Sequence, residues 1–121
     1  VSDVMHTGEE LPLVLNNIVM SEAILVMTAK SFGCLGVVDT NGVLQGVITD
    51  GDLRRHMGPE LLTRLTGQVM TTGSTSIRPE ALVNEALRTM TSKFITALFV
   101  IENQRPIGII HIHDCLRAGV A

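Results

Sequence analysis

The sequence predicts an α+β fold made of two β-α-β-β-α repeats that pack with pseudo-two-fold symmetry. Internal repetition, hydrophobic periodicity and chain length support this prediction. Three pairs of stretches match: VSDVMHTG at 1–8 with TGQVMTTG at 66–73, SEAILVM at 21–27 with NEALRTM at 84–90, and GVITDGDLRR at 46–55 with GIIHIHDCLR at 108–117. The two halves of the chain are therefore copies of one motif.

Hydrophobic periodicity predicts the same order of elements in each copy. Apolar residues recur at i, i+3, i+4 and i+7 in two amphipathic helices: Met20, Ala23, Ile24 and Met27 in the first copy, and Val83, Ala86, Leu87 and Met90 in the second. Apolar runs after each helix predict paired strands, at 35–39 and 43–49 and again at 98–101 and 106–111. Asn41-Gly42 is a hairpin signal. We expect a shorter helix to begin at Asp50 and at Ile112.

The matching stretches set the expected boundaries: a first motif at 1–56, a linker at 57–67 and a second motif at 68–121. Pro59 predicts one turn of helix within the linker. A motif with one amphipathic helix cannot cover both faces of its small sheet, so we expect the copies to pack against each other, with a ligand in the cleft between them. The chain starts at Val1 without an initiator methionine, which suggests that it was cut from a longer protein.

Composition narrows the classes of partner. The 121 residues can bury roughly two-thirds of the unfolded surface, and the chain has three Phe and no Trp or Tyr, so base stacking is disfavoured. The net charge of −3 argues against nucleic acid. Cys34 and Cys115 are too few for a disulfide scaffold, and no apolar run approaches the roughly 18 residues of a membrane span. We expect a cytoplasmic protein with no membrane or nucleic-acid partner.

The stretch Thr49-Asp50-Gly51-Asp52 directly follows a predicted strand and leaves three interpretations open: a metal loop, an aspartate nucleophile, or a turn that holds a phosphorylated sugar. Free N–H groups at a helix start favour an anion, and Gly51 lets a phosphate approach. Thr49 adds a hydroxyl donor, Asp52 can accept both hydroxyls of a ribose, and Arg55 lies on the same helix face. Alternatively, Thr49 or Asp50 only caps the helix, and Asp52 contributes less than ~1 kcal/mol through the helix dipole.

The second copy departs from this motif at its first position. His111 stands where the first copy has Thr49, whereas Asp114 and Arg117 are kept. An imidazole can bind phosphate in a pH-dependent way. In a strand His111 and His113 would share a face, so a metal pair is the alternative, although a third ligand at zinc-like spacing is missing. We expect no metal ion and no catalytic residue in this chain.

The remaining histidines and cysteines carry weaker signals. His6 and His56 are expected to be solvated. Cys34 has no evident base partner, so we expect a small buried thiol rather than a nucleophile.

The chain resembles a tandem pair of cystathionine beta-synthase (CBS) motifs, known as a Bateman module. The family motif is Gly-x-x-Thr-x-x-Asp at the end of the third strand, and the first copy has it as Gly46, Thr49 and Asp52. The resemblance implies that Thr49 and Asp52 hold the phosphate-bearing ribose of a nucleotide. With the helix-start argument and the repeat match, the other expected ligand contacts are Asp50, Gly51, Arg55, His111, His113, Asp114 and Arg117.

TDGDLRR at 49–55 and HIHDCLRAGV at 111–120 further resemble the regulatory region of the arabinose-5-phosphate isomerase (KpsF/GutQ) family. This resemblance implies a parent enzyme with an N-terminal sugar isomerase domain, which is absent here. That parent would interconvert ribulose 5-phosphate and arabinose 5-phosphate for Kdo, lipopolysaccharide or capsule synthesis.

Two ligands remain open, an adenine nucleotide and CMP-activated Kdo, and no cofactor is required. We expect a homodimer, which would form a tetramer in the parent enzyme. The rival interpretation is a structural oligomerisation module without a ligand.

Overall fold

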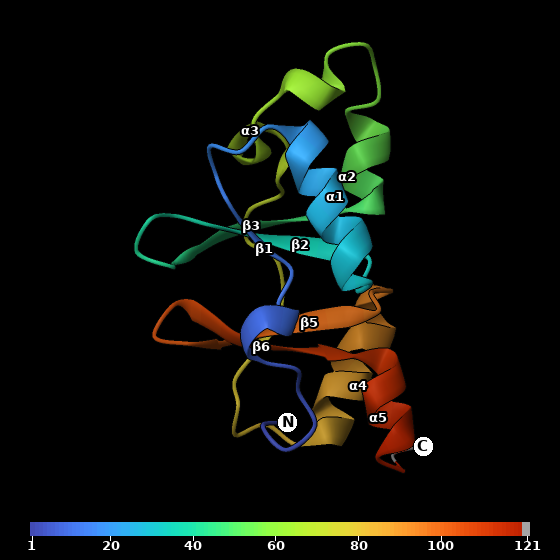
Figure 1. The fold of residues 1–121 in the computed structure, drawn as a ribbon. Coiled ribbons are helices and arrows are strands. Elements are labelled where there is room, and N and C mark those ends of the chain that lie inside the picture. The colour runs from blue at the N-terminus through green and yellow to red at the C-terminus, as the bar shows by residue number, and fades with distance from the viewer. Residues whose placement is uncertain (120–121) are drawn as a thin grey trace. The chain divides into compact units, whose positions relative to one another are not determined.

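The computed structural model describes residues 1–119, which form two compact units. The Pro12 unit is Pro12–Ser74, and the Thr75 unit joins Val1–Leu11 to the residues from Thr75 onward. Each unit has its own three-stranded sheet and its own hydrophobic core (Figure 1). Within the described part of the chain, no helix has both the length and the apolar character needed to cross a membrane.

The Pro12 unit follows the predicted order of elements. These are β1 (Leu13–Leu15), α1 (Met20–Lys30), β2 (Cys34–Val38), β3 (Leu44–Thr49), α2 (Asp50–Arg55), the 3-10 helix η2 (Leu61–Thr63) and α3 (Thr66–Val69). In the sheet, β2 lies between β1, to which it is parallel, and β3, to which it is antiparallel. The turn of helix expected after Pro59 is η2, whereas α3 has no counterpart among the predicted helices.

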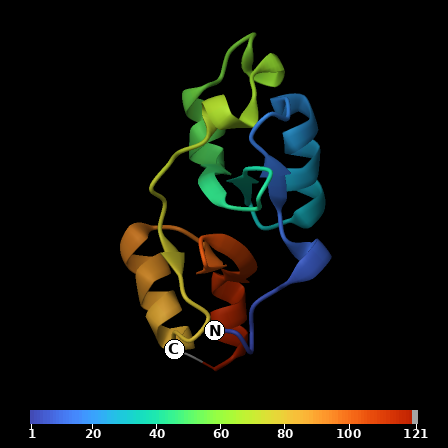
Figure 2. The ribbon, with the colours of Figure 1, turned by 90° about the vertical axis from the view of Figure 1, so that its left-hand side faces the viewer.

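The Thr75 unit repeats the same topology. Its elements are the 3-10 helix η1 (Gly8–Glu10), β4 (Ser76–Ile77), α4 (Val83–Lys93), β5 (Ala97–Glu102), β6 (Arg105–His111) and α5 (Ile112–Arg117). Here β5 is the central strand, parallel to β4 and antiparallel to β6. Figures 1 and 2 show α4 and α5 side by side in this unit. The α+β fold with two β-α-β-β-α repeats is thus confirmed.

Apolar side chains at helical spacing join each main helix to its sheet. The Pro12 core consists of Val14, Met20, Ala23, Met27, Leu35, Val37, Ile48, Leu61 and Val69. The Thr75 core includes Ile77, Ala81, Ala86, Met90, Leu98, Val100, Ile110 and Cys115. Burial of these side chains removes apolar surface from water and is the main source of stability of each unit.

Both main helices end on a non-glycine residue in the left-handed conformation. Ser31 (φ 65°) follows α1, and its N–H donates to the carbonyl of Met27. Phe94 (φ 57°) follows α4, and its N–H donates to the carbonyls of Met90 and Thr91. Because both helices end on a left-handed residue, the turn into the next strand begins at the equivalent position in both repeats.

The segment that opens each sequence repeat lies in the unit built by the other repeat. Val1–Leu11 belongs to the Thr75 unit, where His6 forms a β-bridge with Ile109. The stretch 66–74 belongs to the Pro12 unit, where Thr71 forms the equivalent bridge with Val47. The boundaries of the compact units therefore differ from those of the predicted sequence motifs, because each leading segment packs with the other repeat.

Two equivalent glycines allow these bridges to form. A Cβ atom on Gly46 would lie 2.7 Å from the carbonyl oxygen of Thr71 and 2.9 Å from the sulfur of Met70. In the other unit, a Cβ atom on Gly108 would collide with the sulfur of Met5. At Gly46 the added atom would meet backbone, so the bridging segment would have to shift, whereas at Gly108 the flexible Met5 side chain would have to move first and the carbonyl oxygen of His6 lies 3.1 Å away.

We expect Gly46→Ala to lower the free energy of unfolding by about 1–3 kcal/mol, because the backbone oxygen of Thr71 cannot move away without breaking the bridge. Gly58→Ala is the matched control, since a Cβ atom there meets nothing within 4 Å. Urea denaturation of both variants measures the effect. Equal midpoints would contradict the close approach at Gly46.

Candidate functional site

In the Pro12 unit, the end of β3 and the start of α2 bring the motif residues together. Thr49 is the last residue of β3 and the N-cap of α2, with extended backbone (φ −123°, ψ 176°). Asp52, at the third helical position, reaches back to it. The Thr49 N–H donates to Asp52 Oδ2 at 2.8 Å, and the Thr49 hydroxyl donates to the same oxygen at 3.1 Å. These two bonds fix the entry of the chain into α2.

The second oxygen of the Asp52 carboxylate has donors of its own. The Arg55 guanidinium and the Thr71 hydroxyl both donate to Oδ1. An ionised carboxylate has about four acceptor positions, and here four donors occupy them. The Asp52 side chain is therefore buried (3% exposed) but fully hydrogen-bonded and paired with a cation.

These contacts set the charge of Asp52. Burial by itself raises the pKa of its carboxyl group, but hydrogen bonds from Thr71, Thr49 and Arg55 outweigh burial and hold the pKa below its usual value of 3.8. Because the folded pKa is lower than the unfolded one, the stability that Asp52 provides is complete above the unfolded pKa. It is lost as the pH falls through the folded value.

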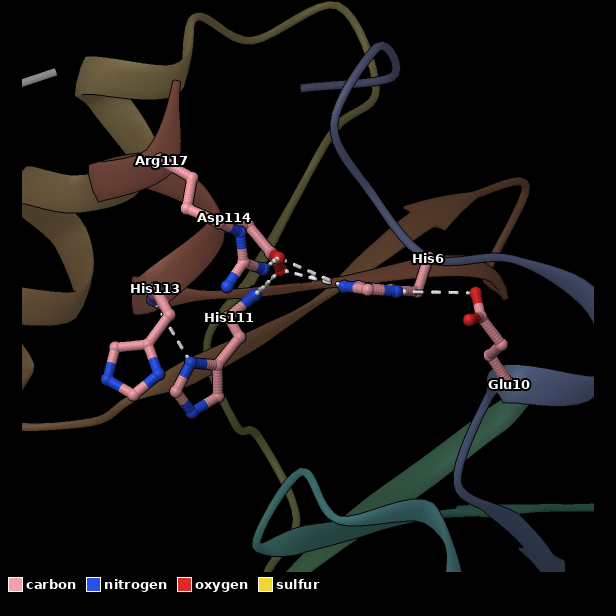
Figure 3. Close-up of polar contacts among 6 residues, drawn as sticks. All are labelled: His6, Glu10, His111, His113, Asp114 and Arg117. Carbon is pink, nitrogen blue, oxygen red and sulfur yellow. Dashed lines mark hydrogen bonds and ion pairs between the residues drawn. The ribbon is translucent and has the colours of Figure 1, made fainter. Parts of the chain in front are cut away.

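The Thr75 unit contains the equivalent cluster around Asp114 (Figure 3). The N–H of His111, the N-cap of α5, donates to Asp114 Oδ2 at 2.7 Å. Arg117 donates to Oδ1. The fourth member is His6, whose Nε2 lies 3.0 Å from Oδ1 and 3.1 Å from Oδ2. Asp114 is thus also buried (side chain 5% exposed), and three groups contact its two oxygens.

His6 is not solvated, and that expectation was wrong. Its side chain is 29% exposed, and its ring lies between two carboxylates, Asp114 and Glu10. His6 occupies the place that Thr71 has in the other unit. The matching Val-Met pairs at 4–5 and 69–70 offered a signal for both residues, because His6 and Thr71 each follow the pair directly.

His111 and His113, the alternative metal pair expected on one strand face, lie in different elements. His111 ends β6, whereas His113 lies in α5, and its N–H donates to His111 Nδ1 at 3.1 Å. The ring centroids are 4.6 Å apart. Burial, followed by the charge of His113, lowers the pKa of His111. Within residues 1–119, no group of three or more His, Cys, Asp or Glu side chains is placed to hold a metal ion.

The other predicted site residues differ in access to solvent. Asp50 and His113 are exposed, and Thr49 and Gly51 are half-buried. The arginine side chains are 63% exposed at Arg55 and 69% at Arg117, although each binds its buried aspartate. The arginines are thus the most accessible cations of the two clusters.

Neither cysteine has the environment of a nucleophile. Burial raises the pKa of the Cys34 thiol to about 12. Burial, followed by the charge of Asp114, also raises the pKa of Cys115. Both groups remain protonated thiols at neutral pH.

His56 was expected to be solvated, and in the structure it is half-buried.

The chain matches a protein-family model and several curated proteins. The sequence model of the CBS domain matches residues 1–58 and 67–121. Over 122 residues the chain is 41% identical to arabinose 5-phosphate isomerase KdsD of Escherichia coli (strain K12). That match covers 99% of this chain but 37% of the enzyme, so the chain spans well under half of the relative's length.

Solved structures share the fold. A crystal structure of CBSX2 in complex with AMP superposes with a TM-score of 0.83 at 23% identity, covering 98% of this chain and 94% of the other. The CBS domain pair of MJ0100, in complex with 5′-methylthioadenosine and S-adenosyl-L-methionine, also gives a TM-score of 0.83, at 22% identity and the same coverage. At these identities the likeness establishes the fold.

Burial and hydrogen bonding raise the expected contribution of Asp52 to stability above the ~1 kcal/mol of a helix-dipole contact. We expect Asp52→Ala to lower the free energy of unfolding by about 1–3 kcal/mol, because it leaves the Thr49 N–H and the Thr71 hydroxyl without their acceptor. Asp50→Ala, an exposed position in the same helical turn, should change it by under ~1 kcal/mol.

Urea denaturation at neutral pH and at about pH 3 measures both effects. The difference between wild type and Asp52→Ala should shrink as the pH falls, since the wild-type carboxyl then becomes protonated. Equal losses for Asp50→Ala and Asp52→Ala would show that the buried hydrogen bonds add nothing.

Proposed function

Because the chain belongs to the CBS-domain family, with two copies of the domain, we propose that it is the ligand-sensing region of a sugar-phosphate isomerase. The parent enzyme would interconvert arabinose 5-phosphate and ribulose 5-phosphate in Kdo, lipopolysaccharide or capsule biosynthesis. Support comes from the 41% identity to KdsD, which extends over 99% of this chain. The part of KdsD outside the match would carry the isomerase activity, so this chain alone should not turn over the sugar phosphate.

A phosphate-bearing nucleotide is the ligand class that the site favours. The observation that carries this proposal is the pair of accessible arginines, Arg55 and Arg117, each anchored through one nitrogen to a buried aspartate. A guanidinium presents five N–H donors in one plane, and the anchor uses only part of them. The exposed remainder can bind a phosphate in a bidentate way, at a position that the aspartate has fixed.

The hydrogen bonds of Asp52 argue against the role of ribose acceptor that the sequence suggested for it. Its four acceptor positions are filled by Thr49, Arg55 and Thr71, so a ribose hydroxyl could bind this carboxylate only by displacing one of them. The Thr49 N–H and hydroxyl are both used by Asp52, so we assign the ligand contact in this unit first to Arg55 and the backbone at Gly51. Asp52 acts chiefly by orienting Arg55.

Two ligands fit this chemistry. An adenine nucleotide is suggested by CBSX2, whose crystal structure holds AMP; the compounds held by MJ0100 contain adenosine but no phosphate, so they support only the adenine part. CMP-activated Kdo would be the end product of the proposed pathway and would act as a feedback inhibitor. Both present phosphate to an arginine, and no additional cofactor is needed for either.

A second candidate function is assembly without a ligand. Several large apolar side chains are exposed on or beside the helices: Leu25 (70%), Met57 (70%) and Leu116 (54%). Such side chains favour burial against another protein surface. We propose a homodimer formed through the short helices that follow each third strand, and contact with the isomerase domain in the parent. The dimer is compatible with sensing, but it would be the whole function if no nucleotide bound.

Nucleotide binding separates the two candidates. Thermal-shift assays with AMP, ATP, CMP and CMP-Kdo should identify one stabilising ligand, because a ligand at one hundred times its dissociation constant adds about 2.7 kcal/mol. Calorimetric titration of that ligand should then show roughly tenfold to hundredfold weaker binding to Arg55→Ala. Arg54→Ala, the exposed neighbour in α2, is the matched control.

Light scattering on the same samples gives the oligomeric state, which we expect to be a dimer at tens of micromolar. Denaturation curves for both arginine variants establish that each is folded. A dimer that no nucleotide stabilises would overturn the sensing function and leave assembly as the role of the chain.

A further inference from the structure

The two clusters differ in the residue that holds the bridging segment. In the Pro12 unit, Thr71 exchanges two backbone hydrogen bonds with Val47, at 2.9 and 3.0 Å, and its hydroxyl donates to the buried aspartate. In the Thr75 unit, His6 exchanges two backbone bonds with Ile109, also at 2.9 and 3.0 Å, and its ring contacts Asp114. The backbone hydrogen bonds are equivalent in the two units, but only His6 adds a side chain that titrates near neutral pH.

Both ring nitrogens of His6 face carboxylate oxygens. Nε2 lies 3.0 Å from Asp114 Oδ1, and Nδ1 lies 3.3 Å from Glu10 Oε2 (Figure 3). An ionised carboxylate can only accept a hydrogen bond, whereas a neutral imidazole has one N–H donor and one lone pair. Only the doubly protonated ring can donate to both partners. The neutral ring would turn a lone pair toward one of the two anions.

Other charged and titratable groups surround this contact. On α5 and its N-cap, Arg117 donates to Asp114, while His111 and His113 lie beside the same carboxylate. The positive charge of Arg117 opposes that of His6, and Asp114 and Glu10 favour it. Asp114 also accepts from the His111 N–H and from Arg117, which are donors independent of the His6 ring.

We propose that His6 is a proton-dependent clamp that fastens residues 1–11 to the sheet of the Thr75 unit. The clamp is tight when the imidazole carries two protons and donates to both Asp114 and Glu10. Loss of one proton leaves the backbone bridge to Ile109 in place but removes the charge-assisted contacts of the ring. The segment then opens more often, while the equivalent segment of the Pro12 unit is unaffected.

The direction of the pKa of His6 supports the clamp. Burial lowers this pKa, but the hydrogen bonds and charges of Asp114 and Glu10 more than offset burial, so the net pKa lies above the ordinary value of 6.5. For a group whose pKa is raised by folding, the added stability is complete below the unfolded pKa. It is lost as the pH rises through the folded pKa. The clamp therefore weakens on the alkaline side of neutrality.

Amide hydrogen exchange measures the opening of each segment separately. The reporters are the amides of His6 and Ile109, and the internal controls are the amides of Thr71 and Val47, which make the same bridge without a histidine. Protection factors, corrected for intrinsic exchange, are compared between about pH 6 and about pH 9. We expect the reporters to lose protection about threefold to tenfold, as the charge-assisted contact is lost, and the controls to stay constant.

Two variants test whether the loss of amide protection at high pH comes from the His6 imidazole. His6→Thr installs the residue type of the other unit, so its reporter amides should show no pH dependence beyond that of the controls. Glu10→Gln removes one of the two anions and should lower the His6 pKa, measured from the imidazole signals by NMR. Glu102→Gln, an exposed acid at the hairpin end of β5 in the same unit, several residues along the sheet from the bridge at Ile109, is the charge-matched control and should leave that pKa unchanged.

A wild-type His6 pKa at or below 6.5 would contradict the proposed clamp. The clamp is also overturned if reporters and controls change equally with pH, or if His6→Thr keeps the wild-type pH dependence. Nucleotide binding plays no part in these measurements, so failure of the clamp is distinct from failure of the proposed function.

Discussion

A buried, fully hydrogen-bonded aspartate at the third position of a short helix is the interaction on which each unit depends. Asp52 and Asp114 each join three parts of the chain: the N-cap residue at the end of a strand, an arginine one turn further along the helix, and the residue that follows a Val-Met pair far away in sequence. A charge can be buried only when it is paired and bonded. The carboxylate therefore requires all of its donors, and the three segments are held at one point.

The same arrangement links stability to recognition. Each aspartate orients an arginine whose side chain is mostly exposed, at 63% for Arg55 and 69% for Arg117. A guanidinium that is already oriented loses less conformational freedom when it binds a phosphate. The units differ in their third donor, a threonine hydroxyl in one and an imidazole in the other. Two copies of one motif thus each hold an arginine through a buried aspartate, but only one of them has a third donor that titrates near neutral pH.

Local patterns in the sequence account for most of the fold. Helical spacing located α1 and α4, alternating apolar runs located the paired strands, and the repeat matched Asp52 with Asp114. The exchange of leading segments was missed because contacts between residues 1–11 and 105–111, or between 66–74 and 44–49, are long-range and leave no periodic signal. The Val-Met match made Thr71 and His6 equivalent, but it did not reveal that both touch an aspartate. For the same reason the sequence left Asp52 as either a ribose acceptor or a helix-dipole residue, and it did not reveal the burial of Asp52 or its bond from Thr71.

A double-mutant cycle between Asp52 and Thr71 tests most directly whether the buried carboxylate fastens the distant segment. The free energy of unfolding is measured for wild type, Asp52→Ala, Thr71→Val and the double variant, with Thr63→Val replacing Thr71→Val in a control cycle. If the hydroxyl of Thr71 bonds the carboxylate, the two substitutions should couple by about 0.5–3 kcal/mol, and the control pair should be additive. Additivity of Asp52→Ala and Thr71→Val within roughly 0.3 kcal/mol would contradict the account.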